Sequence, residues 1–223
     1  MFITGIRMPI KSESALSGLA SSIGFIKKIV GFLVVGFVLN GLLISLDVYS
    51  SGLFHLVLKA SPIYYTLFVS FLSIGGIIGA VILGKIQKYV NTAYRVSFLI
   101  LLFSPAILFI ALSRTAIGDI ADSLLIGILI PVINIPLQAN LMKIVPRNIY
   151  GKVMAFLRVF LGGATPAMAA VFSFMALFMQ VNVILLYIGI IVFPIGTLAF
   201  LVLPKFFEMG KGESVSTDNT SGT

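Results

Sequence analysis

The chain consists of long runs of apolar residues separated by short segments that hold most of its charges. A helix rises about 1.5 Å per residue and the hydrocarbon core of a membrane is about 30 Å thick, so about 20 apolar residues can cross it as a helix. Six runs are long enough, and they do not show the alternation of a transmembrane β-barrel strand. The pattern therefore predicts an all-α integral membrane protein whose six transmembrane helices span approximately residues 29–46, 63–84, 96–113, 123–142, 153–178 and 181–203.

Polar segments flank this predicted bundle of residues 29–204. Within residues 1–28, apolar residues recur at helical spacing between serines, which predicts a short amphipathic helix lying on the cytoplasmic membrane surface. Residues 205–223 become small and polar, and we expect a disordered cytoplasmic tail there.

The composition supports the membrane assignment and excludes several other classes of protein. Hydrophobic residues make up 59% of the chain and charged residues 10%, whereas about a quarter of an average soluble domain is charged. There is no cysteine and one histidine, His55, so thiolate metal sites, cysteine nucleophiles and histidine clusters within one chain are excluded. No paired acids or other catalytic set lies at membrane depth either. We therefore expect no metal, no cofactor and no enzyme activity.

The basic residues predict the orientation in the membrane. The connections on one side hold twelve Lys and Arg residues and those on the other side hold two, Lys59 and Arg114. The positive-inside rule then places both termini in the cytoplasm of a protein in the cell membrane. The formal net charge of +8 does not predict nucleic-acid binding, because the basic residues form no continuous stripe, and the expected partner is the lipid bilayer.

The second and fifth predicted spans share a glycine pattern. Residues 75–80, Gly-Gly-Ile-Ile-Gly-Ala, align with residues 162–167, Gly-Gly-Ala-Thr-Pro-Ala, at an offset of 87 residues. Each span is the middle one of three, which predicts two inverted three-helix repeats. Small residues leave flat helix faces that serve either close packing within one bundle or a sliding interface with another unit. The residues concerned are Gly75, Gly76, Gly79, Gly162, Gly163 and Ala167.

Few polar residues lie near the middle of a span. Asn40 lies there in the first span, and Asn134 and Gln138 lie one turn apart on the same face of the fourth. Pro131 and Pro136 bracket Asn134 and remove two helical hydrogen bonds, which predicts a broken helix of the kind that marks binding sites in transporters. The alternative is that each amide pairs with a neighbouring helix. No carboxylate is expected at mid-membrane, and the interfacial Arg158 is expected to snorkel or to pair with a loop.

The stretch from Asn134 to residue 154, which includes Pro146, Gly151 and Lys152, resembles the tenth helix, following loop and eleventh helix of the major facilitator superfamily, in its macrolide-efflux-like branch. The glycines of the second span, followed by Gly84 and Lys85, resemble the eighth helix and its loop. An Asp-Arg pair of the family is replaced here by Gly84-Lys85, so no gating salt bridge is expected at that loop.

The resemblance implies that the six spans correspond to helices seven to twelve, the C-terminal half of such a transporter. It places Asn40, Asn134 and Gln138 along the path of a small-molecule substrate and puts the glycine faces against another half. The function implied is proton-coupled efflux of an amphipathic small molecule by alternating access. A separate partner half, a homodimer and a truncated form all remain open, and the alternative function is a noncatalytic membrane scaffold or assembly protein.

Overall fold

A computed structural model describes residues 23–90, 93–146 and 149–218. These residues contain helices and no strand, which confirms the all-α prediction for the described part of the chain. The elements are α2 (Val30–Gly52), the π-helical turn η1 (Leu53–Val57), α3 (Pro62–Val90), α4 (Ala93–Leu112), α5 (Ala116–Ile144), α6 (Tyr150–Met175) and α7 (Val181–Asp218).

Helices α3 to α7 are long and apolar enough to cross a membrane, as expected of a multi-pass membrane protein. Helix α2 has 23 residues, but the side chains at positions 42, 44, 45 and 47 lie outside the described residues. The first predicted span, residues 29–46, therefore stays a prediction. The predicted surface helix also lies largely outside the described residues. Within residues 1–28 only 23–28 are described, and these are helical.

The last helix extends beyond the expected end of the sixth span. Helix α7 continues to Asp218, through most of the segment for which we expected a disordered tail at residues 205–223. Packing explains the first turns of this extension, because Phe206 and Phe207 are buried and the Phe206 ring stacks on Phe32 at a centroid distance of 4.0 Å.

Helix α5 also differs from its prediction. It runs without interruption from Ala116 to Ile144 through both Pro131 and Pro136, so the expected helix break is absent. Each proline removes a single backbone hydrogen bond, and the remaining bonds together with packing against α3 sustain the helix. Gly79 of α3 leaves room for the Pro131 ring, since a Cβ added at Gly79 would lie 2.8 Å from its Cγ.

Helices α3 and α5 pack side by side and run parallel. Near their beginnings, Ser123 Oγ donates a hydrogen bond to the Phe68 carbonyl at 3.0 Å, and further along both helices Gly79 faces Pro131. Helices α2 and α6 form a second parallel pair. There the Tyr49 hydroxyl donates a hydrogen bond to the carbonyl of Phe172.

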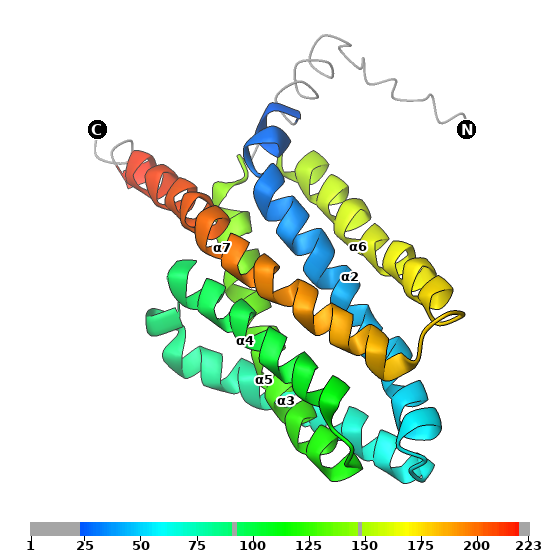
Figure 1. The fold of residues 1–223 in the computed structure, drawn as a ribbon. Coiled ribbons are helices and arrows are strands. Elements are labelled where there is room, and N and C mark those ends of the chain that lie inside the picture. Colours follow the sequence, from blue (N-terminus) through cyan, green and yellow to red (C-terminus); the bar gives the residue numbers. More distant parts are fainter. Residues whose placement is uncertain (1–22, 91–92, 147–148, 219–223) are drawn as a thin grey trace, which may run out of the picture.

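Helices α4 and α7 form an antiparallel pair. Ser104 Oγ donates a hydrogen bond to the Gly189 carbonyl at 2.8 Å, while Leu101, earlier in α4, faces Gly196, later in α7. Helix α7 also contacts α2 and α5, and α4 also contacts α5. Figure 1 shows α7 crossing between the α2/α6 pair and the group formed by α3, α4 and α5. The fold therefore consists of two parallel pairs held together by α4 and α7.

Candidate functional site

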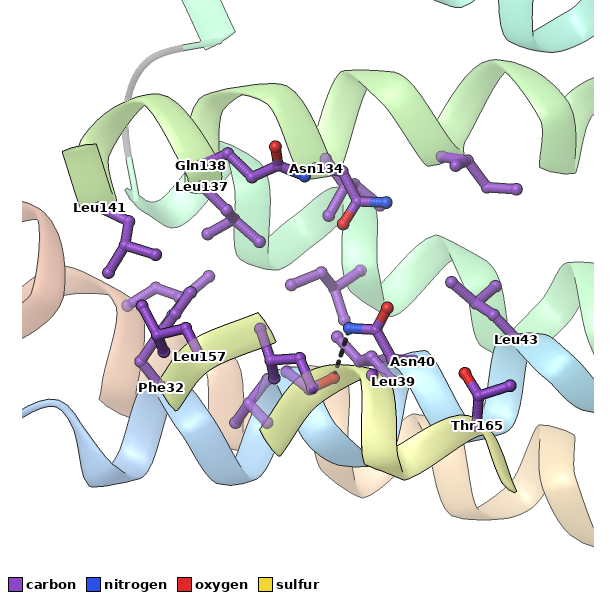
Figure 2. Close-up of a pocket in the computed structure, with 18 of the residues that line it drawn as sticks. Phe32, Leu39, Asn40, Leu43, Asn134, Leu137, Gln138, Leu141, Leu157 and Thr165 are labelled. Carbon is purple, nitrogen blue, oxygen red and sulfur yellow. Dashed lines mark hydrogen bonds between the residues drawn. The ribbon is translucent and has the colours of Figure 1, made fainter. Parts of the chain in front are cut away.

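A cavity of about 460 Å³ lies between the α2/α6 pair and α5, with α4 and α7 contributing to its wall. Asn40 of α2 and Asn134 and Gln138 of α5 all line it, so the structure brings together the three polar residues that the sequence singled out. Figure 2 shows the Asn40 and Asn134 side chains extending into the space between their helices. A polar side chain that pairs with a neighbouring helix is expected to be buried. Asn40 and Gln138 are instead exposed to the cavity or its opening.

The amide groups are available for binding to different degrees. Asn40 Nδ2 donates a hydrogen bond to the carbonyl of Gly36, one turn earlier in the same helix, at 2.8 Å. This bond occupies one donor and leaves the Asn40 carbonyl oxygen and a second N–H. Asn134 is half-buried. An amide both donates and accepts hydrogen bonds, so this group of residues can bind polar atoms of either kind.

Two further polar side chains reach the cavity from α6, namely Arg158 and Thr165. Sequence reasoning assigned Arg158 to the membrane interface and treated Thr165 as part of the glycine pattern. Their spacing was a usable signal, because Arg158, Gly162 and Thr165 recur at intervals of four and three residues and so share one helix face. Most of the remaining wall is apolar and includes Phe103 and Ile107 of α4.

Contacts between helices show how the polar groups are distributed along the cavity. In the parallel α2/α6 pair, Gly36 faces Leu161, so Arg158 lies about one turn before Leu161, near the level of Phe32. The ring of Phe32 stacks on Phe206, whose carbonyl accepts a hydrogen bond from Asn140 Nδ2 at 3.0 Å.

Asn140 belongs to the same turn of α5 as Gln138. Gln138 and Arg158 therefore lie toward one end of the cavity. Toward the other end, Gly41, the neighbour of Asn40, faces Ala164, the neighbour of Thr165. The cavity thus has polar groups toward both ends, and Asn134 lies between them, one turn of α5 from Gln138.

The glycine pattern separates into two structural environments. Gly75 and Gly79 are buried against α5, where a Cβ added at Gly75 would lie 3.0 Å from the Cα of Gly127. An added Cβ at Gly76, Gly162 or Gly163 would meet no described atom within 4 Å. Ala167 is exposed. Close packing within the bundle thus accounts for two of the glycines. Gly162 lines the cavity, while Gly76 and Gly163 lie on open faces of α3 and α6.

The residues of the predicted loop motif lie at the α5–α6 connection and do not line the cavity. Pro146 is half-buried, while Gly151 and Lys152 are exposed in the first turn of α6. The neighbouring Val145 and Val153 are buried. The connection is therefore anchored by apolar side chains.

Asp119, in the first turn of α5, is the most buried carboxylate among the described residues. Neither of its oxygens has a hydrogen-bond partner there, and one oxygen of Asp122 is also without one. Both residues precede residue 123, the expected start of the fourth span, and the packing that buries the α5 N-terminus cannot be read from apolar runs. Asp119 and Asp122 lie outside the cavity wall, which contains neither Asp nor Glu.

The arrangement provides hydrogen-bonding groups and one guanidinium in a mostly apolar space, which is suited to binding a small molecule. The described residues contain no group of three or more His, Cys, Asp or Glu side chains that could hold a metal ion. Comparison of the chain with protein-family profiles, with curated proteins and with solved structures gave no match.

Proposed function

We propose that these helices form one six-helix half of a secondary transporter of the major facilitator type, corresponding to its C-terminal half. The observation that carries the proposal is the convergence of Asn40, Asn134 and Gln138 on one cavity. These residues were selected because each is polar within an apolar span, and unrelated structural asparagines would have no reason to face a common space.

The pairing of the helices supports an inverted repeat. An inverted repeat would make α2 equivalent to α5, α3 to α6, and α4 to α7. The α3/α5 pair then corresponds to the α6/α2 pair, and the α4/α7 pair corresponds to itself. The contact between α4 and α5 likewise becomes the contact between α7 and α2. Both parallel pairs also have a glycine at the crossing, Gly127 of α5 and Gly41 of α2. These equivalences are those expected of two inverted three-helix units.

In this proposal the cavity alternates between the two sides of the cell membrane, with both termini in the cytoplasm. An amphipathic small molecule binds to the amides and the apolar wall and leaves in exchange for protons. The coupling carboxylates belong to the other half, because the cavity wall described here has none. The function requires no catalytic residue and no cofactor.

A separate polypeptide, a second copy of this chain and a longer chain of which this one is a truncated form are all compatible with the proposal as the source of the other half. Helices α3 and α6 are the least buried of the five long apolar helices, and their open glycines Gly76 and Gly163 are suited to close packing against another helix. The same faces also suit a scaffold, which remains the second candidate. A scaffold, however, does not account for the polar residues of the cavity.

Proton flux in proteoliposomes tests the proposal. The chain, purified with any protein that copurifies from native membranes, is reconstituted with a pH-sensitive dye and an acidic interior. Cationic, neutral and anionic amphiphiles are then added outside, and we expect at least one class to accelerate alkalinisation of the interior.

Asn134→Leu removes a cavity amide and should reduce this flux at least about fivefold, since buried hydrogen bonds to a ligand contribute on the order of 1–3 kcal/mol. Ile135→Leu is the matched control, because Ile135 is exposed on α5 outside the cavity wall. Absence of flux with every amphiphile, from a protein that still forms a stable complex, would favour the scaffold.

A further inference from the structure

We infer that the cavity binds an amphipathic anion, with the acidic group of the ligand held between Arg158 of α6 and Gln138 of α5. This inference rests on the proposed function and adds the charge and orientation of the ligand. The anionic group can belong to an organic solute or to the headgroup of an anionic lipid, since both present the same acceptor oxygens.

The charge of the cavity wall is the first step of the argument. Arg158 is the one ionisable side chain among the described lining residues, which otherwise consist of apolar residues, glycine, threonine and three amides. Arg158 is exposed, and on the side of the apolar wall its charge is screened less than in water, so an anion is attracted there. A cationic ligand would meet this charge without any acidic group in the wall to compensate for it.

The positions of the donors are the second step. Arg158 lies near the level of Phe32, whose ring stacks on Phe206, and the Phe206 carbonyl accepts a hydrogen bond from Asn140 in the same turn as Gln138. Gln138 and Arg158 therefore lie toward the same end of the cavity, on facing helices. Arginine presents several N–H donors in a fixed plane, which suits two oxygens of a carboxylate, sulfonate or phosphate. The Gln138 amide contributes two further N–H donors. Figure 2 shows Gln138 and Leu137 on the α5 side of this space, with Leu157, next to Arg158, on the α6 side.

The rest of the cavity sets the shape of the ligand. Thr165 lies seven residues after Arg158 on α6, which corresponds to about 10 Å along the helix. Apolar residues, among them Ile133 and Leu161, line the cavity between the two polar ends. A matching ligand therefore has an acidic group, an apolar body about 10 Å long and, at the far end, a group that can hydrogen-bond to Asn40 or Thr165.

Two probes that differ in charge but share an apolar body test the inference. The chain is placed in phosphatidylcholine nanodiscs, and the affinities for naphthalene-2-sulfonate and naphthalene-2-sulfonamide are measured by equilibrium dialysis, with binding to empty nanodiscs subtracted. We expect the sulfonate to bind at least about tenfold more tightly than the sulfonamide, since a charge-assisted hydrogen-bonded pair contributes more than a neutral one.

Arg158→Gln should reduce the preference for the sulfonate to less than about twofold, and Arg158→Lys should retain part of it. Arg95→Gln is the matched control, because it removes the same charge from an exposed position on α4 outside the cavity wall, and it should keep the full preference. Repetition in nanodiscs that contain phosphatidylglycerol identifies the source of the anion. Competition by this lipid indicates a headgroup site, and unchanged sulfonate binding indicates a solute site.

Equal affinities of the wild-type chain for the two probes, or a preference that persists in Arg158→Gln, would overturn the inference while leaving the proposed transport intact. Absence of binding by either probe would overturn the inference and would also count against the cavity as a substrate site. Proton flux driven by a cationic amphiphile alone would support transport and contradict the anionic ligand.

Discussion

Replacement of Gly75 by alanine tests the close approach of α3 and α5. The added Cβ would lie 3.0 Å from the Cα of Gly127 and would also contact the carbonyl oxygen of Leu124. Both contacts are with backbone atoms, so no side-chain rotation can relieve them, and the two helices must move apart. Overpacking of this kind costs about 1–3 kcal/mol.

Gly76 provides the matched control on the same helix. A Cβ added there would meet no described atom within 4 Å. Both substitutions gain helix propensity, which stabilises by up to about 1 kcal/mol. We therefore expect Gly76→Ala to be as stable as the wild type or slightly more stable, and Gly75→Ala to be about 1–3 kcal/mol less stable than Gly76→Ala.

Titration of the folded protein with sodium dodecyl sulfate in mixed micelles, followed by circular dichroism, measures this difference. Gly127→Ala approaches the same crossing from α5, since its Cβ would lie 3.0 Å from the Cα of Gly75, and it should behave like Gly75→Ala. Equal stability of Gly75→Ala and Gly76→Ala would refute the close packing of α3 on α5 and the helix pairing built on it.

Two further substitutions are tested by the same titration. Asn140→Leu removes the hydrogen bond from α5 to the Phe206 carbonyl of α7. The variant should be less stable by about 0.6 kcal/mol, the average for such interhelical bonds in membranes. An unchanged or increased stability would contradict this contribution. Asp119→Asn preserves the side-chain shape but removes a carboxylate that is fully buried without a partner, so the variant should be at least as stable as the wild type. A loss of more than about 1 kcal/mol would show that a donor engages this carboxylate.

The sequence predicted the features that depend on a single helix. Apolar length was sufficient to find α3 to α7, because the hydrocarbon core sets a minimum number of residues whatever the packing. Asn134 could likewise be predicted as a candidate site residue from its place within an apolar span, since a polar group at that depth needs a partner or water.

The features that depend on two helices could not be predicted in the same way. The sequence pattern around Gly75 is similar to that around Gly162. In the structure Gly127 packs against Gly75, whereas no described atom lies within 4 Å of a Cβ added at Gly162. Similarly, Pro131 alone predicts a break in α5, whereas the helix continues through it and the proline ring packs against Gly79 of α3. Arg158 lines the cavity through the position of α6 against α2, which a helix boundary alone does not determine.

The central claim is that the cavity between α2, α5 and α6 is open to water and ligand, and single-cysteine labelling in native membranes tests it most directly. The chain contains no cysteine, so each introduced thiol is unique within it. Asn134→Cys and Thr165→Cys place thiols in the cavity wall, while Phe193→Cys places one on the exposed outer face of α7, where it would meet lipid. A charged methanethiosulfonate reagent stays in water and is attacked only by a thiolate that is hydrated, so we predict modification at positions 134 and 165 and none at 193. Unreactive thiols at both cavity positions, or equal reaction at all three, would contradict the account.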